Sequence, residues 1–223
     1  MGRTEVSRVA LGLAALWLLA AGSLEAQFGS LPNPRQAPQA RSQDELDSYL
    51  EIVTATEPRD VIRLVDAFVR KFSVSELLSS AYDVQLHAYE RLDDFDGMLV
   101  AGRLSLSGSP NNLNTLLSLS SALANRAGHG PDRDRLLGEA RGYAERALLG
   151  MDRIRISRKL PLEQLHVQKR QMQSEAHGVL GLVALQRGQS AAAVSELGSA
   201  LTLATKPEGG TVFAASRGAG SGG

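Results

Sequence analysis

Few side chains in this sequence have the type and spacing that catalysis or metal binding requires. The four histidines are His87, His129, His166 and His177, and none stands in a His-Glu-x-x-His zinc pattern. Asp83 and His87 are four positions apart, so a helix would place both on one face. Two ligands are too few for a zinc site. We therefore expect Asp83 and His87 to lie on a solvated polar face and His177 to pack in a core.

The acidic and glycine-containing turns give equally little indication of a bound ligand. The run Asp93-Asp94-Phe-Asp-Gly97 lacks the alternating ligands and the closing Glu of a calcium loop, so a turn between two helices explains it better. Gly128-His-Gly130 follows no strand, which argues against a phosphate-binding loop. No Gly-x-Ser-x-Gly sequence presents a nucleophilic serine. The sequence predicts a protein that is not an enzyme and holds no cofactor or metal.

Composition narrows the classes of partner. The chain has 223 residues, of which 24 are basic and 24 acidic. Its net charge of zero therefore gives no indication that it binds nucleic acid or an anionic membrane. It has no cysteine, which excludes disulfides, thiolate metal sites and a lipid-modified N-terminal cysteine. The basic cluster at residues 153–159 is interpreted as a solvated connector, with a docking patch for an acidic partner as the alternative.

Residues 1–26 are typical of a secretory signal peptide. Arg3 and Arg8 precede the apolar run of residues 9–21, and small residues lead up to Ala26. Cleavage after Ala26 predicts a mature chain that is periplasmic or secreted. The alternative is an uncleaved inner-membrane anchor at residues 9–21, a run shorter than the about 20 residues that a span needs. Residues 27–41 are predicted to be a disordered linker, and residues 206–223 a disordered Gly/Ser-rich tail.

The segment between these ends has the spacing of amphipathic helices and no sustained alternation typical of strands. A capping box, Ser42 to Glu45, predicts a helix over about 43–54. Pro58 starts the next helix, since proline is tolerated in the first turn. A second capping box, Ser73 to Glu76, predicts the start of the third helix. These signals place the first pairs of helices.

Similar signals place the later helices. Asn111-Asn112 precedes a leucine-rich helix, a further helix covers about 132–151, and Pro161 opens a long helix that ends at a turn marked by Gly188. The last two helices are expected to bury matching faces, which consist of Ala176, Val179, Leu180 and Val183 on one helix and Ala193, Val194, Leu197, Ala200 and Leu201 on the other. No polar capping helix follows, so the last apolar face either stays partly exposed or belongs to a chain cut short.

Two of these units resemble the tetratricopeptide repeat. The later unit has Leu180-Gly181 in its first helix and Ala193, Leu197 and Ala200 in its second. The earlier unit has Tyr82 and Tyr89 in the aromatic positions and closes with a proline at position 110. The two capping boxes are 31 positions apart, close to the ~34-residue period of that family. The units depart from the pattern where Gln85-Leu86 replaces Leu-Gly and where His177 takes an aromatic position.

The resemblance implies an all-α fold, a right-handed α-solenoid of about four antiparallel helix pairs over residues 42–205. In this family the first helix of each pair lines a concave face. The positions that correspond to its ligand contacts are Asp83, His87, Glu90, Arg91, Asn114, Leu117, Ser121, Asn125, Glu175, Leu182 and Gln186. A mixed polar groove of this kind suits an extended peptide, although the same residues could simply face solvent.

Two functional classes remain open. The first, which the resemblance favours, is a non-catalytic interaction scaffold of the bacterial cell envelope that binds a partner peptide or protein. The second is an accessory helical domain of a periplasmic enzyme or of an envelope assembly or secretion complex. Nucleic acid is not expected as a partner, and a membrane is expected only through an uncleaved signal. Fold does not imply function, so the choice depends on the site.

Overall fold

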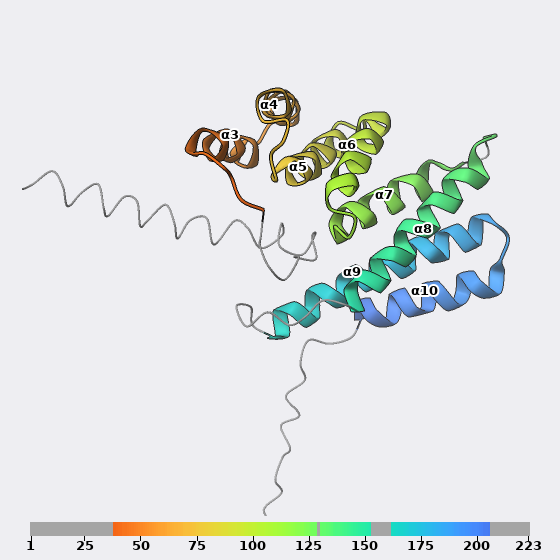
Figure 1. The fold of residues 1–223 in the computed structure, drawn as a ribbon. Coiled ribbons are helices and arrows are strands. Elements are labelled where there is room, and N and C mark those ends of the chain that lie inside the picture. Colours follow the sequence, from red (N-terminus) through yellow and green to blue (C-terminus); the bar gives the residue numbers. More distant parts are fainter. Residues whose placement is uncertain (1–37, 129, 153–161, 206–223) are drawn as a thin grey trace, which may run out of the picture.

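The described part of the chain is helical, as the sequence predicts (Figure 1). The computed structural model describes residues 38–128, 130–152 and 162–205, of which 82% are in eight helices and none are in strands. The predicted signal peptide, most of the linker, the basic connector and the Gly/Ser-rich tail lie outside the described residues. None of the helices within the described ranges has the length and apolarity needed to cross a membrane.

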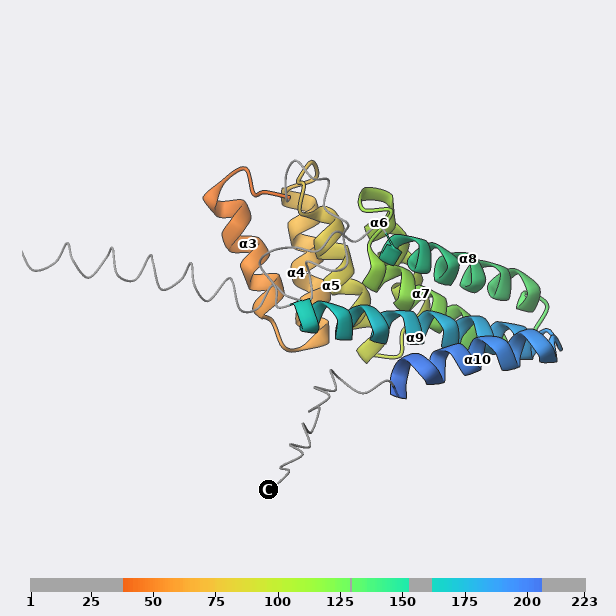
Figure 2. The ribbon, with the colours of Figure 1, turned by 90° about the horizontal axis from the view of Figure 1, so that it is seen from below.

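The helices form one row in which each packs on the next. In chain order they are α3 (Gln43–Thr54), α4 (Pro58–Lys71), α5 (Leu78–Arg91), α6 (Phe95–Gly108), α7 (Leu113–Arg126), α8 (Arg133–Asp152), α9 (Leu162–Gln186) and α10 (Ser190–Thr205). The most extensive contacts join α5 to α6, α7 to α8 and α9 to α10, and α9 also packs on α7. Figures 1 and 2 show α3 at one end of the row and α10 at the other.

Side-chain caps fix several helix starts that the sequence indicates. The Ser42 hydroxyl accepts a hydrogen bond of 3.1 Å from the Glu45 amide at the start of α3. The Asn112 side chain accepts one of 3.2 Å from the Thr115 amide at the start of α7. Asp94 caps α6 in the same way. Each cap satisfies one of the amide donors that a helix start leaves unpaired.

The capping box expected at Ser73 is wrong, because α5 begins at Leu78. The chain first makes a turn in which the Ser75 hydroxyl accepts a hydrogen bond of 2.9 Å from the Leu77 amide. That turn buries Leu77 in the core formed by α3, α4 and α5. The burial of one apolar side chain therefore decides where this helix begins, and the Ser73 to Glu76 pattern does not.

Two turns depend on a left-handed backbone. Gly188, between α9 and α10, has a φ of 71°, which glycine adopts without steric cost. Asp93, between α5 and α6, has a φ of 55°, a conformation that aspartate tolerates better than most residues. The acidic run at 93–97 is thus the α5–α6 turn and the first residues of α6. This agrees with its interpretation from the sequence.

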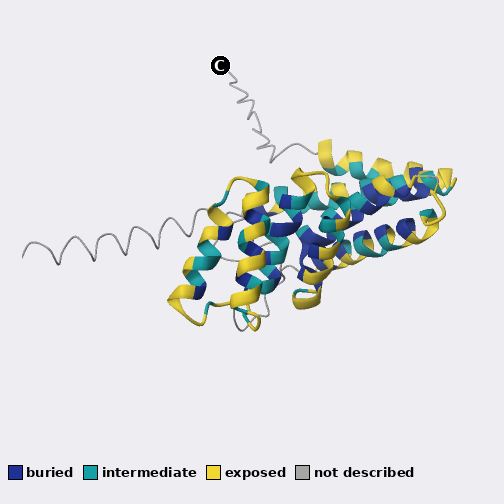
Figure 3. Ribbon diagram, turned by 90° about the horizontal axis from the view of Figure 1, so that it is seen from above, coloured by how far each residue is buried: buried dark blue, intermediate teal, exposed yellow. Residues whose placement is uncertain are grey.

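The core is densest around α7. Five of its leucines, Leu113, Leu116, Leu117, Leu119 and Leu123, are each 3% exposed or less. They pack with residues of α5, α6, α8 and α9 in two adjoining clusters, while a third cluster joins α3, α4 and α5. Figure 3 shows the buried residues on the sides of helices that face their neighbours. The leucines of α7 therefore form the centre of the core.

The α9–α10 pair is closer than ordinary side chains would allow. A Cβ atom on Gly181 would lie 2.6 Å from the Cγ atom of Leu197 and 3.2 Å from its backbone nitrogen. A larger residue at this position would therefore require Leu197 to move or the two helices to separate.

The apolar face predicted for α10 is only partly buried. Ala193 is 3% exposed, but Val194 is 73%, Leu197 43% and Leu201 64% exposed. The prediction of one buried face is therefore wrong for these three side chains. The reason is that α10 packs along α9 at the end of the row, and its apolar stripe is wider than one neighbour covers. The last apolar face is thus partly exposed in this structure.

Candidate functional site

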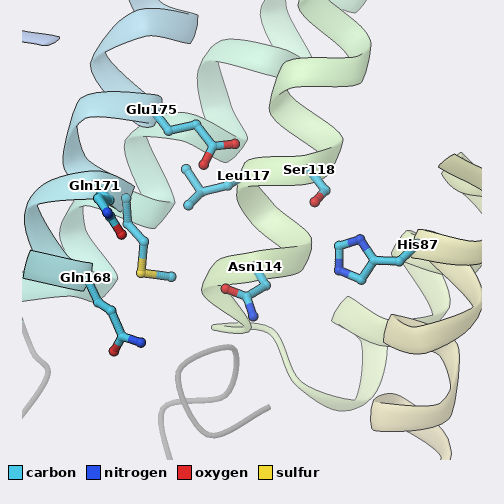
Figure 4. A pocket seen from close by; sticks show the side chains of 8 residues that line it. His87, Asn114, Leu117, Ser118, Gln168, Gln171 and Glu175 are labelled. Atoms are coloured by element: carbon cyan, nitrogen blue, oxygen red, sulfur yellow. The ribbon is translucent and has the colours of Figure 1, made fainter. Parts of the chain in front are cut away.

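The first candidate pocket opens between α5, α7 and α9. It has a volume of about 290 Å³. Its lining residues are His87, Asn114, Leu117, Ser118, Gln168, Gln171, Met172 and Glu175. Figure 4 shows His87 on one side, the α9 side chains on the other, and the α7 side chains between them. Amide, hydroxyl, carboxylate and imidazole groups surround a small apolar surface made by Leu117 and Met172.

The second candidate pocket lies further along α7, beside the α5–α6 turn. Its volume is about 330 Å³. Its lining residues are Glu90, Asp93, Asp94, Phe95, Met98, Ser121, Ala122, Asn125 and Arg126. The guanidinium carbon of Arg126 lies 5.3 Å from the centre of the Phe95 ring. That contact holds Arg126 against the far wall of the pocket.

The two pockets follow a single face of α7. Asn114, Leu117 and Ser118 line the first pocket, and Ser121 and Asn125 line the second. These residues are three or four positions apart, which places them one above another along a helix. α5 contributes His87 to one pocket and Glu90, three residues later, to the other. We call the residues that line either pocket, taken together, the α7 groove.

Seven of the eleven residues expected at a concave face line the α7 groove. His87, Asn114, Leu117 and Glu175 line the first pocket, and Glu90, Ser121 and Asn125 line the second. The other four lie elsewhere. Arg91 is exposed at the last position of α5. Leu182 packs against the core cluster between α7, α8 and α9.

Gln186 and Asp83 hold helices together. The Gln186 amide nitrogen donates a hydrogen bond of 3.0 Å to the Ala124 carbonyl of α7. The Asp83 carboxylate accepts a hydrogen bond from the Thr115 hydroxyl, again joining α7 to its neighbour. Burial raises the pKa of Asp83, and the hydrogen bond from Thr115 opposes that rise. Asp83 is thus a packing residue rather than part of the solvated face expected of it.

The α7 groove carries more negative than positive charge. Glu90, Asp93, Asp94 and Glu175 contribute four carboxylates, and Arg126 is the one Lys or Arg among the lining residues. Burial is the main cause that raises the pKa of Glu175, and the charge of Glu90 raises it further. Although Glu175 is exposed at the rim, the pocket walls reduce its hydration. The effect of Glu90 on Glu175 links the two pockets electrostatically.

Two of the histidines, His87 and His177, are paired with carboxylates. The Nδ1 atom of His87 lies 3.0 Å from a carboxylate oxygen of Glu90, on the same helix. His177 is only partly buried, and its Nδ1 atom lies 2.7 Å from a carboxylate oxygen of Glu196 on α10. The expectation that His177 packs as a core residue is therefore wrong, because it joins α9 to α10 by a polar contact. Within the described ranges no three His, Cys, Asp or Glu side chains converge as a metal site requires.

Several lining residues were missed at the level of sequence. In α9 they are Gln168, Gln171 and Met172, which precede Glu175 by seven, four and three positions. That spacing continues the face of Glu175 back along the helix, so it was available as a signal. Ser118, four positions after Asn114, could have been found in the same way. Phe95, Met98 and Arg126 had no such signal, because their place depends on how α6 packs beside α7.

The comparisons with known proteins identify no relative: no family model, no curated protein and no solved structure matches this chain. The structure therefore gives only the fold class, which is all-helical over the described residues, together with two polar pockets that lie along α7.

Proposed function

We propose that this chain is a non-catalytic interaction scaffold that binds an extended peptide segment of a partner in the α7 groove. The observation that carries the proposal is that the two pockets lie one after the other along one face of α7. An extended peptide rises about 3.3 Å per residue, so a short segment would reach from one pocket to the next. The two pockets offer hydrogen-bonding side chains along α7, and the first has a small apolar floor where partly buried Met172 lies beside buried Leu117.

The packing of the helices supports an α-solenoid related to the tetratricopeptide repeat. Contacts are made chiefly between neighbours in the row, as expected where repeats stack in one dimension. We infer four antiparallel pairs, α3–α4, α5–α6, α7–α8 and α9–α10, in a right-handed superhelix. The first pocket is lined by α5, α7 and α9, which are the first helices of three successive pairs. Those are the helices that the resemblance assigns to the concave face.

The charge of the groove indicates the chemistry of the partner. Burial, and next the negative charge of Glu90, raise the pKa of Glu175, so the ionised form of Glu175 is held in this pocket at a cost. A lysine or arginine side chain between the two carboxylates would relieve this cost and gain charge-assisted hydrogen bonds. The partner segment we propose therefore carries at least one basic residue, flanked by polar residues that bond to the amides of Asn125, Gln168 and Gln171.

The location that we propose for this scaffold is the bacterial cell envelope. The support is the signal-like composition of residues 1–26 together with the absence of cysteine from the whole sequence. Mass spectrometry of the protein recovered from the periplasm would give a chain that begins at Gln27. An intact N-terminus in a membrane fraction would support the anchor at residues 9–21 instead.

A peptide selection tests the function. A displayed library of random peptides is selected on the wild-type protein, and each enriched peptide is then titrated against a Glu90→Gln, Glu175→Gln variant. We expect enriched sequences to contain lysine or arginine and to bind the variant at least tenfold more weakly, a loss of about 1.4 kcal/mol. Binding to the wild type should weaken as salt is raised, since screening acts on exposed charges.

The matched control is Glu51→Gln, Glu57→Gln, which removes the same charge from exposed positions on α3 and before α4. This control should bind every enriched peptide as the wild type does. If no peptide is enriched, or if the groove variant and the control bind equally well, the groove is not a peptide site. Backbone amide shifts in α7 on adding peptide would place the bound segment directly.

A further inference from the structure

The outer face of α10 is unlike the exposed face of an ordinary surface helix. Its exposed residues after the first, Ser190, are here called the α10 face and are Ala191, Ala192, Val194, Ser195, Leu197, Gly198, Leu201, Thr202, Ala204 and Thr205. None is charged, whereas exposed helix faces usually carry charged side chains. The one charged residue of α10 is Glu196, and its carboxylate contacts His177 of α9. Val194 and Leu201, 73% and 64% exposed, stand out from this face.

Three hydroxyl groups on or beside this face bond to their own helix. The Thr202 hydroxyl donates a hydrogen bond of 2.8 Å to the Gly198 carbonyl, and the Thr205 hydroxyl one of 2.9 Å to the Leu201 carbonyl. Ser199, at the side of the face, bonds to its own helix in the same way. Because these donors are already paired, covering the face with protein leaves none of them unsatisfied. The α10 face can therefore lose its hydration at little cost.

The centre of the α10 face allows another helix to come close. A Cβ atom on Gly198 would meet no atom within 4 Å, so the backbone is open to the outside at this point. Ala191 and Ala192 add no large side chain at the first turn. Small residues of this kind permit the shorter of the usual 8–10 Å separations between packed helices. Val194 and Leu201, on either side, would then fill the space around the contact.

We propose that the α10 face binds the same face of a second copy of this chain, which makes an isologous dimer. An uncharged face of this kind meets its own copy without repulsion, and two-fold pairing buries the same residues on both sides. Head-to-tail stacking of the row is disfavoured by charge. The helix at its other end, α3, exposes Asp44, Asp47 and Glu51, and burying these carboxylates against an uncharged face would be costly.

The size of the face limits the strength of the dimer. A helix of 16 residues is about 24 Å long at a rise of 1.5 Å per residue. One helix face of that length covers less than the roughly 800 Å² per partner of a standard interface. We therefore expect a dimer that forms at micromolar concentrations and dissociates on dilution. This dimer leaves the α7 groove, on other helices, free in each copy.

Sedimentation velocity of the full-length chain over a wide concentration range tests the proposal. The wild type should shift from monomer to dimer as concentration rises, and Leu201→Lys should stay monomeric over the same range. Val100→Lys, which changes a side chain of α6 that is 59% exposed, should dimerise like the wild type. Circular dichroism checks that both variants keep the helical content of the wild type.

Cross-linking then locates the contact, because the chain has no cysteine of its own. Gly198→Cys should form a disulfide-linked dimer under mild oxidation. Gly142→Cys is the matched control, since a Cβ there also meets nothing within 4 Å, and it should stay unlinked. A monomeric wild type would overturn the proposal, and so would association that Leu201→Lys leaves unchanged. A wild type that dimerises only after residues 206–223 are removed would assign the face to the chain's own tail and overturn it equally.

Discussion

At the scale of single residues, the folded structure disfavours the ionised form of the Glu175 carboxyl group. The pocket walls, and next the charge of Glu90, raise its pKa above the ordinary value of 4.5. A carboxyl group with a raised pKa in the folded state lowers stability wherever it is ionised in both states. That cost is present in full above the raised pKa. It falls as the pH drops through that pKa, and it is gone below the ordinary value, where both states are protonated.

Glu175→Gln should therefore raise the free energy of unfolding at neutral pH. The expected gain is less than about 1 kcal/mol, because solvent screens a side chain at the rim of a pocket. Urea unfolding at pH 7 and again at about pH 4 measures the difference, which should shrink at the lower pH.

A Glu90→Gln background supplies the control for this prediction. Since Glu90 is one cause of the raised pKa, the gain from Glu175→Gln should be smaller there. A gain that is equal at both pH values would mean that the substitution acts through packing and not through charge. The same pair of residues is the one assigned to a basic side chain of the partner, so the stability data also test the electrostatic premise of peptide binding.

At the scale of elements, the α9–α10 pair depends on one glycine. Gly181→Ala would place a Cβ atom 2.6 Å from the Cγ atom of Leu197, so the helices must separate or Leu197 must move. We expect a loss of about 1–3 kcal/mol from overpacking, partly offset by the better helix propensity of alanine. Gly178→Ala, in the same helix, meets nothing within 4 Å and should stabilise by up to about 1 kcal/mol. Denaturant unfolding followed by circular dichroism compares the two variants.

A Leu197→Ala background gives the decisive check on this account. It removes the Cγ and Cδ atoms that the new methyl group would meet and leaves only the 3.2 Å approach to the backbone nitrogen of residue 197, so most of the cost of Gly181→Ala should disappear. If the cost of Gly181→Ala persists without the Leu197 side chain, the close approach to that side chain is not its cause.

The helices themselves were largely predictable, because local signals define them. Ser42, Asn112 and Gly188 mark helix ends by satisfying or redirecting the nearby backbone, and the leucines of α7 show which side is buried. The start of α5 was not predictable from Ser73, since the burial of Leu77 depends on α3 and α4. The exposure of Val194 and Leu201 was given only as one alternative, for a similar reason. A periodic pattern identifies an apolar face, but only the packing of the chain decides whether a neighbour covers it.

The candidate site was predictable where it follows helical spacing and unpredictable where it depends on packing between helices. The repeat register assigns four residues from three helices to one face, and the first pocket contains all of them. They are His87, Asn114, Leu117 and Glu175. Asp83 has the same register, yet a hydrogen bond from Thr115 makes it part of the packing. Sequence position alone does not distinguish a side chain that faces the groove from one that joins two helices.

At the scale of the whole molecule, the core is divided along the row of helices. The cluster of α3, α4 and α5 centres on Phe68, which is 2% exposed and contacts the rings of Tyr49 and Phe72. The clusters around α7 draw on α5 through α9. In a protein whose helices contact mainly their neighbours, stability is approximately a sum of local terms. The two halves of the row should therefore open with different free energies.

Phe68→Ala tests this division. Removing a buried phenylalanine typically costs about 3–5 kcal/mol, and here the loss falls on contacts among α3, α4 and α5. Native-state hydrogen exchange should show much faster exchange of the amides in α3 and α4, while those in α7 and α8 keep nearly the protection of the wild type.

Ala144→Gly is a suitable converse, because Ala144 is fully buried in a cluster around α7. This variant should lower the protection of α7 and α8 first. Uniform loss of protection in both variants would mean that the row unfolds as one unit. In that case a partner bound in the α7 groove would stabilise every helix equally. With independent halves, it would protect α5, α7 and α9 and leave α3 to open on its own.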